Sequence, residues 1–124
     1  MGKTEALRQL VTAQLRTVQG PVYHRIAPAD AEYPYKTYEL SPSFPDCCLV
    51  EFEFTVDLWD RSADWKRIEE IADDIEDLFN GTNLPQETIF PTFYRESRTP
   101  LTDPDKSLQH IQQRFYVHLY EKEE

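Results

Sequence analysis

The sequence predicts an α+β fold in which a mainly antiparallel sheet of four to five strands packs against two helices, in the order α-β-β-β-α-β-β. Two adjacent segments carry this prediction. From Cys48 to Leu58 apolar and polar residues alternate, as in a strand with one buried face. From Trp65 to Phe79 apolar residues recur every three or four positions, as on one face of a helix. With a length of 124 residues, we expect one domain spanning 1–124.

The amino-terminal part contributes a helix and two strands. An amphipathic helix is predicted over Thr4–Val18 and ends at the Gly-Pro pair at 20–21. We expect its apolar side to pack on the sheet; the alternative is that part of it faces a partner. A short apolar run at 22–26 predicts the first strand, and Tyr33–Leu40 predicts the second. Pro34 belongs at the start or edge of that strand, because proline donates no ladder hydrogen bond.

A proline-containing loop is predicted over Ser41–Asp46, either as a wide hairpin connection or as a projecting arm. The central strand follows, and then the second helix, for which Ser62 is the expected N-cap and Gly81 the expected residue after the C-cap. The predicted buried stripe of this helix consists of Trp65, Ile68, Ile71, Ala72, Ile75, Leu78 and Phe79. We expect Phe52 and Ile71 to lie in the core between strand and helix.

Two more strands are predicted in the carboxy-terminal part. Glu87–Arg95 is the fourth, and Pro91 within it indicates an edge strand or a bulge. Ser97–Ser107 contains two prolines and few apolar residues, which predicts a mobile loop with a functional role. Leu108–Tyr120 is the last strand, and Gln113 is the one polar residue on its apolar face.

Charge and composition exclude several classes of function. The formal net charge is −10, which argues against binding to nucleic acid phosphates or to anionic membranes. No apolar run is long enough to span a bilayer, and a polar helix stands where a secretory signal would need an apolar segment. Cys47 and Cys48 are adjacent, which disfavours a disulfide between them and favours a reducing compartment.

The residues that could support catalysis are scattered. His110 and His118 share a strand face but stand eight residues apart, roughly 26 Å, which is too far for one metal ion. No glycine-rich phosphate loop and no nucleophile motif is present. The acidic residues of the second helix fall on its outer side, where we expect them to be solvated: Glu69, Glu70, Asp73, Asp74, Glu76 and Asp77. We therefore expect no enzyme, no catalytic residue, no metal and no cofactor.

The order of elements and four short motifs resemble a family of small phage proteins. The motifs are Ala31-Glu32-Tyr33-Pro34-Tyr35, Val56-Asp57-Leu58-Trp59-Asp60, Ile71-Ala72 in the helix, and Arg114-Phe115-Tyr116-Val117. The family is that of the tail-completion, or tail-to-head joining, proteins of long-tailed bacteriophages, which are related in shape to tail terminators. The resemblance covers nearly the whole chain, and its motifs are motifs of fold and not of catalysis.

The resemblance implies a structural role in the virion, assembled in the bacterial host cytoplasm. Such proteins form a ring, usually six-fold, at the head-proximal end of the tail tube. One side of the ring contacts the tail tube protein and the other contacts the head-completion or connector protein, while genomic DNA passes through the channel without specific binding. An acidic subunit is consistent with this, because like charges keep DNA from adhering. No cofactor is implied.

Six residues are candidates for the interfaces of such a ring: Tyr33, Tyr35, Phe44, Arg98, Leu101 and Asp103. Tyrosines are favoured both within sheets and at interfaces, so the first two suit either role. We expect the Ser97–Ser107 loop to dock on a neighbour through Leu101 and Arg98; the alternative is a solvated connector. Two other functions remain open. One is a tail terminator or other minor tail protein, and the less favoured one is a ligand-binding or enzymatic α+β domain.

Overall fold

The computed structural model describes residues 2–44, 50–81, 83–86 and 88–121. Its elements are α1 (Lys3–Leu15), β1 (Val22–His24), β2 (Tyr35–Ser43), β3 (Val50–Asp60), α2 (Lys66–Phe79), β4 (Ile89–Leu101) and β5 (Gln109–Glu121). The five strands form one sheet in the order β1-β2-β3-β5-β4. Among the described residues, β1 and β2 pair in parallel, and the other three pairings are antiparallel. The predicted fold class and element order are confirmed.

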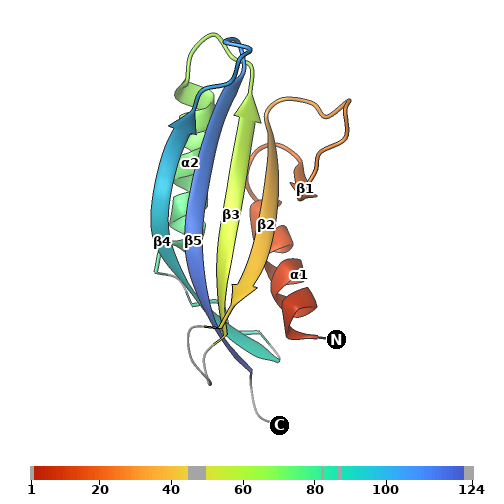
Figure 1. Ribbon diagram of the computed structural model, residues 1–124, viewed down its shortest axis with the longest axis vertical. Coiled ribbons are helices and arrows are strands. Elements are labelled where there is room, and N and C mark those ends of the chain that lie inside the picture. Colours follow the sequence, from red (N-terminus) through yellow and green to blue (C-terminus); the bar gives the residue numbers. More distant parts are fainter. Residues whose placement is uncertain (1, 45–49, 82, 87, 122–124) are drawn as a thin grey trace.

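Both helices cover the same face of the sheet, and the opposite face is open (Figure 1). The buried residues of α1 and α2 share one core with the inward-facing residues of β3 and β5. The strands run along the longest axis of the molecule, so their ends form its two ends (Figure 1). No described helix has the length and apolarity needed to cross a membrane.

A cluster of aromatic rings fills the core between β3 and α2. Phe54 lies at its centre, with its ring centroid 5.1 Å from that of Phe79, 5.6 Å from Phe115, 6.1 Å from Phe93 and 6.2 Å from Tyr38. Edge-to-face and tilted pairs of this kind stabilise by more than the apolar area they bury. The predicted core positions Phe52 and Ile71 are also buried.

Among the buried polar side chains, Gln113 and Lys36 both donate to backbone carbonyls, one on α2 and the other in the segment after α1. Gln113, the predicted exception on β5, is fully buried and donates from Nε2 to the carbonyl of Ala72 on α2, at 2.9 Å. Lys36 of β2 is 1% exposed and donates from Nζ to three carbonyls, those of Val18, Gln19 and Gly20. The buried lysine therefore serves the free carbonyls that follow α1.

Several element boundaries differ from those predicted. The helix α1 ends at Leu15, three residues early, and β2 continues through Ser41–Ser43, which were predicted to be loop. Ser62 does not cap α2: the cap position is Trp65, without a side-chain cap hydrogen bond. Gly81 has a φ of +66°, as expected after a helix end. The predicted start of the central strand at Cys48, and Cys47 beside it, lie outside the described residues.

The largest difference concerns β4. The predicted strand ended at Arg95, whereas β4 continues to Leu101, so the predicted loop Ser97–Ser107 is strand over its first half. A bulge between Arg95 and Ser97 interrupts the period-two pattern and explains the error. As Pro91 indicated, β4 is an edge strand. The turn that joins β4 to β5 is confined to residues 102–108.

The backbone conformation and close surroundings of Gly20 lead to a prediction about stability. It has a φ of +91°, and a Cβ built there lies 2.4 Å from the carbonyl oxygen of Pro34. We expect Gly20→Ala to lower the free energy of unfolding by at least about 1–3 kcal/mol, the usual cost of a strained backbone residue, with the clash adding to it. Gly2→Ala is the matched control, because a Cβ there meets nothing within 4 Å. Equal urea midpoints for the two variants would contradict this account of the close approach.

Candidate docking surface

Three segments that are distant in sequence meet at one end of the sheet, which we call the tip. They are the residues before β2, the connection from β3 to α2, and the turn from β4 to β5. Arg61 joins them. Its Nη2 lies 2.6 Å from the Asp105 carboxylate, its Nη1 donates to the Ser107 hydroxyl, and its guanidinium carbon lies 5.3 Å from the centroid of the Tyr33 ring. One cation therefore holds the tip together through an ion pair and a cation–π contact.

The turn at the tip is also organised by its own hydrogen bonds. The Asp105 amide donates to the Asp103 carboxylate at 2.9 Å, and the Ser107 amide donates to the Asp105 carboxylate at 3.0 Å. Such bonds from aspartate side chains to nearby amides fix short turns. The hydrogen bonds from Arg61 and Ser107 lower the pKa of Asp105 to about 2, so its carboxylate stays ionised in any ordinary buffer.

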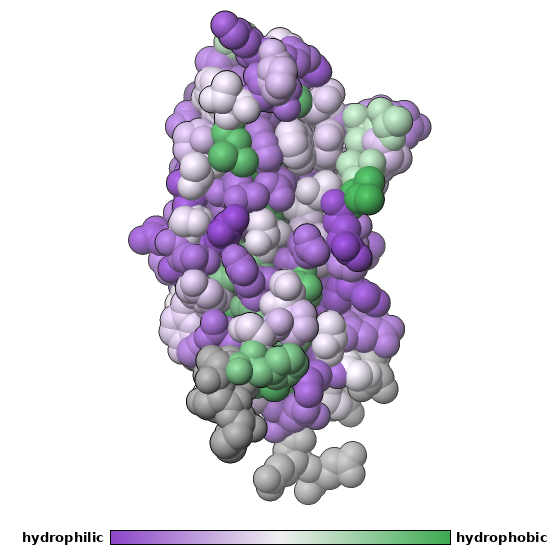
Figure 2. All heavy atoms as spheres, viewed as in Figure 1, coloured by the Kyte–Doolittle hydropathy of each residue, from purple (hydrophilic) through white to green (hydrophobic). Residues whose placement is uncertain are grey.

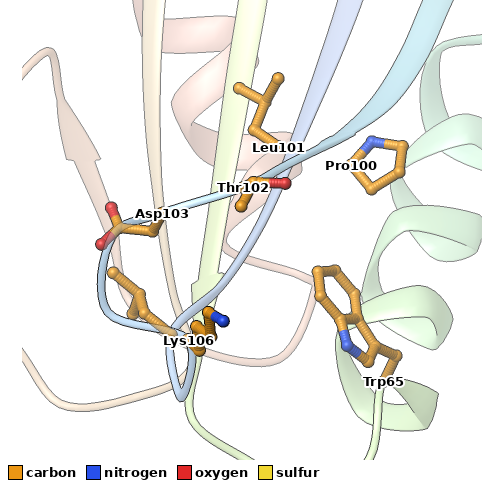
Figure 3. Close-up of a pocket in the computed structure, with 7 residues that line it drawn as sticks. Trp65, Pro100, Leu101, Thr102, Asp103 and Lys106 are labelled. Carbon is orange, nitrogen blue, oxygen red and sulfur yellow. The ribbon is translucent and has the colours of Figure 1, made fainter.

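A pocket of about 290 Å³ opens beside this turn, and we call it the tip pocket. It is lined by Trp65, Pro100, Leu101, Thr102, Asp103, Lys106 and Leu108. Trp65 comes from the start of α2, while the other labelled residues come from the end of β4 and from the turn (Figure 3). The lining is mainly apolar, and Asp103 and Lys106 contribute one charge of each sign. This volume lies at the low end of the range for small-molecule sites, which suits a single side chain better than a cofactor.

A row of aromatic rings crosses the open face of the sheet near the tip. From β2 to β5 it consists of Tyr35, Trp59 and His110, with Tyr33 at its outer end. The centroid separations are 5.4 Å for Tyr33–Tyr35, 6.3 Å for Tyr35–Trp59 and 3.7 Å for Trp59–His110. His110 Nε2 also lies 2.7 Å from the carboxylate of Asp57. Burial among these rings raises the pKa of Tyr35.

A second aromatic group lies on the open face toward the other end of β4 and β5. Phe90 is opposite Tyr120, and Tyr94 is opposite Tyr116. All four are partly exposed, from 36% for Phe90 to 52% for Tyr120. Hydrophobic patches interrupt the otherwise polar surface in the view of this face (Figure 2). Exposed aromatic groups of this kind are typical of protein interfaces.

The structure brings four of the six candidate residues to the tip: Tyr33, Tyr35, Leu101 and Asp103. Phe44 follows β2 at the opposite end of the molecule and is 70% exposed. Arg98 lies on the helix side of β4, where its guanidinium contacts Asp73 at 2.6 Å and Glu76 at 3.3 Å.

Sequence reasoning missed three residues of the tip, namely Arg61, Asp105 and Trp65. Trp65 was assigned to the buried stripe of α2, but it is 38% exposed and lines the tip pocket. The sequence signal that could have indicated this exposure is the position of Trp65 before the first turn of the helix. The acidic face of α2 was predicted to be simply solvated, yet Asp73 and Glu76 form ion pairs with arginines of β4.

The described residues contain no group of three or more side chains suited to hold a metal ion. The two histidines of β5 are each engaged with one carboxylate: His110 with Asp57, and His118 with Glu51 at 3.0 Å. The two pairs lie at separate positions along β5, so they do not converge on one point where a substrate could bind. The features that stand out are surfaces for contact with other proteins.

Comparison with known proteins identifies a family. The sequence profile of the family described as tail completion protein gp17 matches residues 5–120. No curated protein matches the sequence. Among solved structures, the fold is similar to that of a chain from the virion of a native gene transfer agent (GTA) particle, with a TM-score of 0.66 and 13% sequence identity. That similarity covers 90% of this chain and 85% of the other. At this level of identity, the likeness is one of fold.

Proposed function

The chain belongs to the tail completion protein gp17 family, and from this premise we propose that it forms a hexameric ring at the head-proximal end of a phage tail, joining the tail tube to the head connector. The observation that carries the proposal is the family match over residues 5–120. This match makes the chain a structural tail protein of a virion, and an enzymatic or ligand-binding role is therefore much less favoured. The fold shared with a chain from the virion of a gene transfer agent particle supports the same conclusion.

The elongated shape supports contacts with two different partners. The tip carries the aromatic row, the Arg61 contacts and the tip pocket, and the opposite end exposes Phe44. Because the strands span the distance between these ends (Figure 1), one subunit reaches from one neighbouring ring to the other. In this proposal Tyr33, Tyr35, Leu101 and Asp103 contact one ring, and Phe44 contacts the other. Arg98 holds the edge of β4 against α2 beside the tip.

Charge supports the passage of DNA through such a ring. The formal net charge of −10 per subunit opposes adhesion of the phosphate backbone, so a channel made by these subunits would let DNA slide. Closure of the ring requires heterologous contacts, in which different patches of neighbouring subunits meet. The two side edges of this sheet, β1 and β4, are different and suit that requirement.

Deletion of the gene from its phage tests the function directly. We expect filled heads and separate tails of normal length, with infectivity restored when the protein is supplied in trans. Electron microscopy of labelled particles should place the subunit at the neck. Location of the subunit elsewhere in the particle would contradict the proposal.

The second candidate, a tail terminator, predicts a different result in the same experiment. A terminator stops growth of the tail tube, so its loss gives tubes of uncontrolled length. Tail length in the deletion strain therefore separates the two functions. Normal-length tails favour joining, and overlong tails favour termination.

A further inference from the structure

We propose that the tip pocket of each subunit receives Ile26 from the next copy of the same chain, so that this contact closes the ring; the inference rests on the function proposed above. The pocket presents Trp65, Pro100 and Leu108 around a volume of about 290 Å³. Such a volume is large enough for one aliphatic side chain. An apolar anchor that fills a pocket lined by tryptophan is the arrangement typical of interface hot spots.

The occupant comes from the segment between β1 and β2, residues 25–34, which we call the arm. Ile26 within it is 83% exposed, the most exposed large hydrophobic residue described. Figure 2 shows hydrophobic atoms on this projecting part of the surface. A branched aliphatic side chain that is so largely in water gains from burial against a partner.

The arm is held in a fixed shape, which lowers the cost of docking. The amide of Arg25 donates to the carbonyl of Tyr38 at 2.8 Å, and the amide of Ala31 donates to that of Pro28 at 3.0 Å. At the far end of the arm, Tyr33 contacts Arg61 and Pro34 packs closely on Gly20. Ile26 is thus presented on a preformed projection and not on a free tail.

Position and charge both fit a contact between copies. The arm projects beyond β1, which is one edge strand of the sheet (Figure 1). The tip pocket lies between the start of α2 and the end of β4, which is the opposite edge strand. A contact between these two patches is heterologous, as ring closure requires. Exposed Asp30 and Glu32 accompany Ile26 on the arm, together with Arg25, which lies 3.7 Å from Glu39. Lys106 and Asp103 line the pocket, so the acidic residues of the arm find a cation there and Arg25 finds an anion.

Cysteine cross-linking in assembled particles tests the contact. The chain carries Ile26→Cys and Thr102→Cys, with Cys47→Ser and Cys48→Ser to remove the native thiols; Thr102 is an exposed residue of the pocket lining. After oxidation, we expect a non-reducing gel to show a ladder of covalent multimers, because each subunit links to the next. The matched control pairs Ile26→Cys with Phe90→Cys, which lies toward the other end of β4, and should give monomers only.

Particles that hold the double variant at the neck in normal amount but yield only monomers would overturn the contact and leave the proposed function standing. A second measurement covers the case in which the cysteines weaken assembly. We expect Ile26→Asp to lower the yield of infectious particles at least ten-fold, and Ile26→Leu to retain it. Parent-level infectivity of Ile26→Asp, with the protein at the neck, would equally overturn the contact. Absence of the parent protein from the neck overturns the proposed function and this contact together.

Discussion

Phe54→Ala is expected to lower the free energy of unfolding by about 3–5 kcal/mol, the range for phenylalanine truncation in a core. Its ring contacts four other aromatic residues from β2, β4, β5 and α2, so the cavity would open where every layer of the fold meets. Because a domain of this size is stable by only about 5–15 kcal/mol, a large part of the stability would be lost. Urea unfolding followed by far-UV circular dichroism measures the change.

Glu70→Ala is the control for this experiment. Glu70 is exposed on α2, the helix that supplies Phe79 to the same core. Surface charges of this kind are worth a few tenths of a kcal/mol, so the urea midpoint should hardly move. A Phe54→Ala midpoint within error of the Glu70→Ala midpoint would contradict the assignment of the core.

Lys36→Met is expected to cost about 2–5 kcal/mol. The variant keeps a similar volume but leaves the carbonyls of Val18, Gln19 and Gly20 without their buried donor. Each unsatisfied buried group costs about 1–3 kcal/mol, and relaxation of the segment after α1 recovers part of this. Lys66→Met, at an exposed position at the start of α2, is the matched control and should be near neutral.

The same lysine predicts a dependence of stability on pH. Burial lowers the pKa of Lys36 from 10.5 to about 8 in the folded state. Between these values the unfolded chain binds more protons than the folded one, so stability rises with pH in that window. We expect the stability of the parent relative to Lys36→Met to increase between pH 8 and pH 10. A constant or falling difference would contradict burial as the dominant effect on this amine.

Sequence reasoning succeeded where a single local period describes the backbone. The alternation around Phe52 and Phe54 locates β3, because one face of that strand is buried and the other is partly exposed to solvent. The stripe from Ile68 to Phe79 locates α2 for the corresponding reason. The pattern failed for β4, whose bulge at Glu96 breaks the alternation just before a polar stretch.

The candidate site was predictable only in part, because much of it depends on contacts between distant segments. Tyr33 and Tyr35 were named as interface candidates from residue type alone, which suits sheet packing equally well, and both lie in the aromatic row or at its end. The pairing of Arg61 with Asp105 has no local signature, since it exists only after β3 and the β4–β5 turn are brought together. Arg98 was expected to make a charge contact with a neighbour from a loop; in the structure it lies in β4, and the register of that strand turns it toward α2.

Because of the bulge in β4, the spacing of residues in the sequence does not by itself decide which face of the sheet the later side chains occupy. Arg95 is opposite Phe115 and Arg98 is opposite Gln113, so the extra residue lets both arginines face α2 although they are three positions apart. Removal of Glu96, the extra residue, would restore strict alternation and leave Arg98 and Pro100 on their present face, because the two arginines would then stand two positions apart. Removal of one residue later in β4, with the bulge kept, would instead reverse every side chain between that residue and the turn. The bulge is therefore a position in this hairpin where a change of one residue preserves the surface that the tip presents.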